Sequence, residues 1–167
     1  MERFESAALK LERAREHWIA FDREFHAFLA ANPYQVVLEH DPQRGGHVLR
    51  LKVAGKPLPP PRLGVLIGEY VNALRSCLDH LAWALLTEQP PRPQEVEFPI
   101  FTDRTRYLTN APKRIGLIPP AAQEEIERLQ PFNKGLNAET HPLWRIHQLS
   151  RIDKHRTIGV IVHGFIC

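Results

Sequence analysis

The stretch LGVLIGEYVNALRSCLDHLAWALLTE, residues 63–88, gives the clearest structural signal in the chain. Its apolar residues recur in steps of four and three, which is typical of a helix that packs along one side against another helix. These seam positions are Leu63, Ile67, Tyr70, Leu74, Cys77, Leu81 and Ala84. The spacing predicts one long helix over residues 63–88, roughly 40 Å in length at 1.5 Å per residue.

A matching pattern comes earlier in the chain and predicts a helix over residues 3–31, which Asn32-Pro33 would end. Two series of residues repeat every seven positions there: Phe4, Leu11, Trp18 and Phe25, and three places later Ala7, Ala14, Phe21 and Phe28. Between the two helices, residues 34–53 alternate around Gly45-Gly46 and predict a β-hairpin. Such a connection lets the two helices return antiparallel and pack their seams together.

The second half of the chain predicts shorter elements. We expect an extended piece at VEFPIF (96–101), irregular chain with at most one helical turn over 102–118, a short helix over 119–130 and a loop over 133–139. A last helix would cover 141–156, with Thr140 as its cap and Pro142 in its first turn. The apolar tail predicts a terminal strand over 157–166, and either it or VEFPI would extend the hairpin into a small sheet at one end. The prediction is a single α+β domain over 1–167, mainly helical.

The composition excludes several classes of protein. A hydrophobic share of 43% and a charged share of 25% are ordinary for a globular chain. Cys77 and Cys167 form no disulfide framework, and Cys77 lies on a seam as a core residue. The charged N-terminus does not resemble a signal peptide, and no apolar run could cross a membrane, so we expect a cytoplasmic protein. The net charge of +3, from sixteen Arg and six Lys against nineteen acids, is compatible with RNA as a partner.

A polar stripe lies opposite the seam of the second long helix: Glu69, Asn72, Arg75, Ser76, Asp79, His80 and Trp83. The stripe has no Lys and ends in Trp83, which predicts that another element packs on it. The last helix is the candidate, because Asp153 falls on its apolar stripe and needs a buried partner. We therefore predict a polar layer in which Arg75, Asp79 and His80 meet Asp153, with His155 nearby. Buried ion pairs often only fix register, which favours a structural role over a catalytic one.

Two glycines, Gly64 and Gly68, indicate a close approach of another element to the same helix. His17 and His26 lie off the first seam, and we expect both on the surface.

The ordered motifs LRSCLDHLAW, EFPIF, LQPF and LWRIHQLSRIDKHR resemble a family of uncharacterised bacterial proteins, over residues 63–157. Members of that family generally continue beyond the DKHR helix. The resemblance therefore implies that this chain is part of a longer one. It implies no chemistry.

Arg75 and His80 are also similar to the R-x4-H motif of HEPN-type ribonucleases, small helical domains that dimerise and cleave RNA without a metal. This resemblance implies His80 as general acid or base and Arg75 as the residue that holds the scissile phosphate. The chain departs from that family at Ser76, where a polar Asn, Asp or His usually follows the Arg, and in its β-hairpin.

Three functions remain open from the sequence. The first is a non-enzymatic binding or interaction module, alone or as a homodimer, with a structural polar layer. The second is a HEPN-like ribonuclease that uses Arg75 and His80. The third is a metal-dependent hydrolase or sensor, with ligands drawn from Asp79, His80, Asp153 and His155. No nucleotide-binding, zinc-finger or hydrolase motif occurs, so no cofactor is expected.

Overall fold

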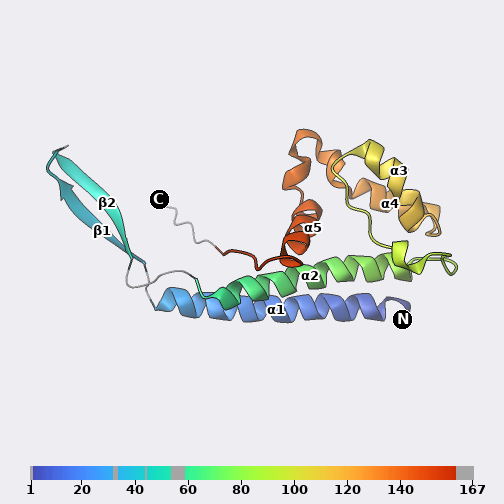
Figure 1. Cartoon of the computed structure of the whole chain (residues 1–167), viewed down its shortest axis with the longest axis horizontal. Helices are drawn as coiled ribbons and strands as arrows, with labels where there is room; N and C mark the ends of the chain where they lie inside the picture. The colour runs from blue at the N-terminus through green and yellow to red at the C-terminus, as the bar shows by residue number, and fades with distance from the viewer. Residues whose placement is uncertain (1, 32–33, 44, 54–58, 161–167) are drawn as a thin grey trace.

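Two long antiparallel helices run side by side along the molecule in the computed structural model (Figure 1). Helix α1 spans Glu5–Ala30, after a single 3-10 turn at Glu2–Phe4, and helix α2 spans Pro61–Ala84. The pair is tied at both ends. Arg3 donates to the carbonyl oxygen of Leu86, and Arg62 Nε lies 2.6 Å from Glu24 Oε1. The predicted helical pair is therefore confirmed.

The structure describes residues 2–31, 34–43, 45–53 and 59–160, and within the β-strands the side chains of 37–41, 46 and 47. The expected helix stop at Asn32-Pro33 lies outside these residues. So does most of the predicted terminal strand, since 161–167 are not described and 157–160 have no regular secondary structure.

A β-hairpin connects the two helices and projects from their end, away from the other helices (Figure 1). Strands β1 (Tyr34–Asp41) and β2 (Gly46–Val53) pair antiparallel, with Tyr34 opposite Val53 and Asp41 opposite Gly46. Gly45, with φ +65°, takes the left-handed conformation that the turn requires. Among the described residues the sheet has these two strands alone, so of the two predicted additions VEFPI is wrong, and the tail lies mostly outside the described residues.

Helix α2 ends at Ala84, four residues before the expected boundary. The reason is a competing set of hydrogen bonds. The backbone N–H of Thr87 and its hydroxyl both donate to the carbonyl oxygen of Leu117, at 3.0 and 2.8 Å. These bonds draw the chain out of the helix and toward the C-terminal half of the molecule.

The region 102–118, expected to be irregular, contains helix α3 (Arg104–Ile115). Asp103 caps it, because its Oδ1 accepts the Arg106 N–H at 2.7 Å. Pro112 lies inside the helix, where proline normally ends helices, so its position weakens the sequence signal for a helix this long.

Helix α4 (Pro120–Arg128) matches the predicted short helix. The expected loop after it is 3-10 helix at Pro131–Thr140, kinked at Gly135 with φ +56°, and another 3-10 turn covers Pro93–Glu95. Helix α5 (Pro142–Asp153) ends three residues before the prediction.

The cap of α5 also differs from the prediction. The Nδ1 atom of His141 accepts the Leu143 N–H at 3.2 Å, whereas the Thr140 hydroxyl donates to the Asn137 carbonyl oxygen. His141, immediately before Pro142, therefore caps the helix in place of Thr140.

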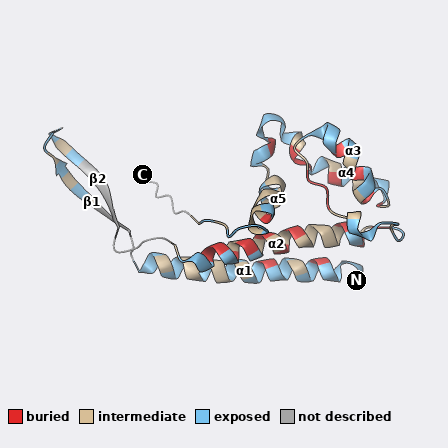
Figure 2. Cartoon of the chain, in the orientation of Figure 1, coloured by how far each residue is buried: buried red, intermediate tan, exposed pale blue. Residues whose placement is uncertain are grey.

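The main core lies at the C-terminal end of α2, where α3, α4 and the extended chain 96–101 meet it (Figure 2). Its buried members are Ala82, Leu86, Phe98, Ile100, Tyr107, Ala111, Ile115, Ile118 and Ile126.

The α1–α2 contact buries only part of the predicted α1 seam. Ala7 and Ala14 are buried, but Leu11 and Trp18 of the other heptad series are 55% and 46% exposed. On α2 the side chains of Arg62 and Glu69 reach α1. Leu66 and Ala73 lie four residues after them, on the same face of the helix, and are buried. The helices thus meet through small residues, which leaves much of the expected α1 seam in solvent (Figure 2).

Candidate functional site

Arg75 lies in the middle of α2 and its side chain is only 10% exposed. Its Nη1 donates to the carbonyl oxygen of Phe98 at 2.8 Å. Its Nη2 lies 2.8 Å from Asp79 Oδ1, one helical turn away, and 3.2 Å from Glu97 Oε2. The guanidinium therefore fastens the extended chain 96–101 to α2.

Asp79 completes this clasp from the next turn of α2. The same Oδ1 atom that meets Arg75 accepts the Phe98 N–H at 2.9 Å. Burial raises the pKa of Asp79, while the charge of Arg75 and the Phe98 hydrogen bond act in the opposite direction. The carboxylate and the guanidinium thus hold both polar backbone groups of Phe98.

Glu97 extends the cluster to α3, and no sequence pattern predicted this. Its Oε1 lies 2.8 Å from Arg114 Nη1. The guanidinium of Arg114 also lies over the ring of Phe101, 5.0 Å from the centroid. Two arginines and two carboxylates, Arg75, Asp79, Glu97 and Arg114, form one ionic cluster, which we call the Arg75 cluster.

Asp153 belongs to a separate network, so the expectation that it meets Arg75 is wrong. Asn72 Nδ2 donates to Asp153 Oδ2 at 2.7 Å, and the Ser150 hydroxyl donates to Asn72 Oδ1 at 2.7 Å. Asn72, one helical turn before Arg75, satisfies the inward-facing acid. The predicted contact between α2 and the last helix is confirmed, but its chemistry is an amide–carboxylate pair.

The close approach predicted at the glycines is confirmed. A Cβ atom on Gly68 would lie 2.1 Å from Asp153 Oδ1, and one on Gly64 would lie 2.2 Å from the Ile158 carbonyl oxygen. These distances exclude any larger side chain unless α5 and the chain after it shift.

The remaining residues of the predicted layer lie elsewhere. On a helix with 3.6 residues per turn, His80 points about 140° away from Arg75. His80 makes no hydrogen bond or ion pair with any described residue. Glu69 Oε2 meets His17 Nδ1 of α1 at 3.0 Å, which leaves the His17 side chain 11% exposed and corrects its expected surface position. His155 is exposed beyond the end of α5, and Trp83 is 48% exposed rather than covered.

His147 of α5 is affected by the charges of the Arg75 cluster, although no sequence pattern indicates it as a candidate. Burial lowers the pKa of its imidazole, and the charges of Arg75, Arg151 and Arg114 lower it further, against the opposite effect of Glu97. Its ring also stacks on Trp144 of the same helix, with the centroids 5.6 Å apart. Burial and these positive charges therefore favour the neutral form of the imidazole.

Buried Gln130, also missed, fixes the same extended chain from the other side. Its side-chain amide donates to the carbonyl oxygens of Pro99 and Ile126, at 2.8 and 3.0 Å, and its Oε1 accepts the Phe101 N–H. The motif LQPF, which contains Gln130, was the one available sequence signal. Both sides of the segment 96–101 are therefore pinned by buried polar side chains.

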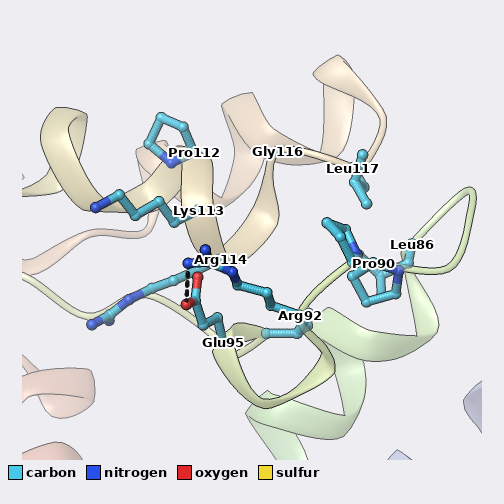
Figure 3. Close-up of a pocket in the computed structure, with 11 residues that line it drawn as sticks. Leu86, Pro90, Arg92, Glu95, Pro112, Lys113, Arg114, Gly116 and Leu117 are labelled. Carbon is cyan, nitrogen blue, oxygen red and sulfur yellow. Dashed lines mark hydrogen bonds and ion pairs between the residues drawn. The ribbon is translucent and has the colours of Figure 1, made fainter.

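A hollow of about 450 Å³ lies beside the cluster, between the chain Pro90–Val96 and the end of α3 (Figure 3). Arg114 contributes both to its lining and to the Arg75 cluster. Across the described ranges, no three His, Cys, Asp or Glu side chains converge in a way that could hold a metal ion. Among the same described residues, no helix has the length and apolar character needed to cross a bilayer.

Comparison of the chain with protein-family models, with curated proteins and with solved structures found no match. The function must therefore be inferred from the geometry.

Proposed function

We propose that this chain is a non-enzymatic interaction module, and that a second copy of it docks on the outer face of the α1–α2 hairpin. The observation that carries the proposal is the exposed part of the α1 seam. Leu11 and Trp18 lie beside Tyr70 and Leu74 of α2, around a hollow of about 400 Å³. Contiguous apolar surface of this kind marks an interaction site in proteins.

The charges around this hollow suit a second copy. Leu11 and Trp18 are one heptad apart, so an antiparallel partner helix would place its Trp18 over Leu11. The two-fold axis then passes midway between the two residues, and Glu12 and Arg15 flank it. Both charged side chains are more than half exposed and lie 3.9 Å apart within one chain. Glu12 can therefore leave Arg15 of its own chain and pair with Arg15 of the second copy, and Arg15 can pair with Glu12 of that copy in the same way.

The Arg75 cluster supports a structural role for the polar residues. A guanidinium that acts on a scissile phosphate needs free donors. Arg75 instead directs its Nη1 and Nη2 atoms to Phe98, Asp79 and Glu97, and its side chain is only 10% exposed. The ribonuclease and metal-dependent functions stay predictions.

Charge exchange tests the proposed pairing. Glu12→Arg leaves two positive residues of each chain at the axis, and Arg15→Glu leaves two negative ones. In sedimentation equilibrium we expect wild type to dimerise, each variant alone to dimerise at least tenfold more weakly, and an equimolar mixture of the two to recover the dimer. The mixture recovers because one chain of the mixed dimer carries the two arginines at the axis and the other carries the two glutamates.

Trp18→Ala should weaken the dimer in the same way. Trp83→Ala is the matched control, because Trp83 is similarly exposed but lies on α2, outside the hollow. Circular dichroism checks folding. A monomeric wild type, or a dimer that Trp18→Ala and both charge variants leave intact, would overturn the proposal.

An RNA assay distinguishes the interaction module from the ribonuclease. Wild type and His80→Ala are incubated with a mixed RNA pool in EDTA. The interaction module predicts no cleavage by either. Cleavage by wild type that His80→Ala abolishes without loss of folding would replace the proposal with the ribonuclease.

A further inference from the structure

The hollow beside α3 has rigid, mostly apolar walls (Figure 3). Its apolar lining comes from both sides of the hollow: Leu86, Pro90, Pro91 and Val96 on one side, and Pro112 and Leu117 on the other. Proline has a fixed φ, so three of these residues restrict the conformations of the walls. A volume of about 450 Å³ falls within the range of small-molecule sites.

Hydrogen bonds hold the two walls in register. Thr87 donates twice to the Leu117 carbonyl oxygen, which joins the chain after α2 to the chain after α3. Gly116 donates its N–H to the Pro112 carbonyl oxygen at 3.0 Å, and a Cβ atom on Gly116 would lie 2.4 Å from that oxygen. The hollow is therefore formed before any ligand binds, which lowers the entropic cost of binding.

The charges of the lining leave one cation unmatched. Arg92 Nη1 lies 3.0 Å from Glu95 Oε1, and Figure 3 shows Arg92 folded back toward that carboxylate. Arg114 is paired with Glu97 outside the hollow. Lys113 makes no ion pair or hydrogen bond with any residue that the structure describes.

The ammonium of Lys113 extends away from Pro90 in Figure 3. Because its four-carbon stem is flexible and exposed, rotation can bring the charge to the mouth of the hollow.

We propose that this hollow binds a small apolar molecule that carries one carboxylate. The apolar part would lie between the proline walls, and Lys113 would neutralise the single negative charge at the mouth. This site is separate from the α1–α2 face, and the inference does not depend on self-association of the chain.

Calorimetry with octanoate and with octanamide tests the proposal on the full chain. The two probes share the apolar tail and differ in charge. We expect octanoate to bind about three- to tenfold more tightly, as one partly exposed ion pair allows. Lys113→Gln should remove this preference and leave octanamide unaffected. Lys134→Gln, at an exposed lysine that does not line the hollow, should change neither affinity.

Pro91→Glu provides a second variant that places an acid at an exposed edge of the hollow. It should weaken octanoate more than octanamide. The proposal fails if octanoate does not bind up to its solubility limit, if both probes bind equally, or if Lys113→Gln and Lys134→Gln behave alike.

Discussion

Helix α2 makes two long contacts of opposite chemistry. Toward α1 it presents buried apolar residues such as Leu66 and Ala73 along both helices, with Arg62 and Glu69 as partly exposed ion pairs beside them. Toward α5 and the chain 96–101 it presents Gly68, Asn72 and Arg75, whose partners are individual polar atoms. A contact spread over many apolar atoms loses little when one is removed, whereas a polar contact depends on each partner. Substitutions should therefore have larger effects on the α5 side.

The largest effect is expected from Arg75→Ala. The change leaves Asp79 half-buried without its counter-charge and removes the donor to the Phe98 carbonyl oxygen. Because one partner of a largely buried ion pair is lost, the free energy of unfolding should fall by about 3 kcal/mol. Urea denaturation measures it.

Arg13→Ala on α1 is the matched control, since its ion pair with Glu16 is exposed, lies outside the proposed dimer hollow and should be worth less than about 0.5 kcal/mol. Equal losses for the two variants would remove the distinction between the two contacts.

Gly68→Ala should come next. Alanine is the better helix former by about 1 kcal/mol, but its Cβ would meet Asp153, and overpacking of this kind costs about 1–3 kcal/mol. We therefore expect a net loss of about 1 kcal/mol. In the Asp153→Ala background the obstruction is gone, so the same Gly68→Ala change should become neutral or stabilising. A double-mutant cycle measures this reversal of sign, and an unchanged sign would contradict the close packing.

The contrast between the contacts also explains what could be predicted. Periodicity predicted both long helices and the hairpin, because each is a regular pattern over many residues. It failed at α3. The buried Tyr107, Ala111 and Ile115 recur every four residues there, but Pro112 lies within the same stretch, and proline normally indicates the end of a helix. On α1 periodicity predicted two series as the seam, of which Ala7 and Ala14 are buried while Leu11 and Trp18 are about half exposed, since heptad spacing alone does not say how deeply each member is covered.

The polar site was harder to predict for a different reason. The stripe on α2 correctly indicated that another element covers Asn72, Arg75 and Asp79. The partners Glu97 and Phe98 lie in extended chain, and no periodic signal indicates where such a chain packs. Asp153 was paired with Arg75 on charge alone, whereas the structure places an amide, Asn72, at that position.

The smallest expected effect is a pH dependence that belongs to the α5 side alone. The pKa of His147 is lowered from its ordinary value of 6.5, through burial and the charges of Arg75, Arg151 and Arg114. Below pH 6.5 the unfolded chain therefore binds more protons at His147 than the folded chain does. The contribution of His147 to stability is present above pH 6.5 and is lost as the pH falls below it. Asp79, whose pKa is raised, acts in the opposite direction.

Unfolding in urea at about pH 7 and about pH 5.5, on either side of the ordinary histidine pKa, tests this contribution. Wild type should lose stability at the lower pH, and His147→Gln should lose less. Some loss should persist, because burial also lowers the pKa of His141. His26→Gln, on the exposed side of α1, should behave as wild type. If His147→Gln keeps the full loss, the imidazole does not interact with the Arg75 cluster, and the polar contact of α5 is limited to Asn72, Ser150 and Asp153.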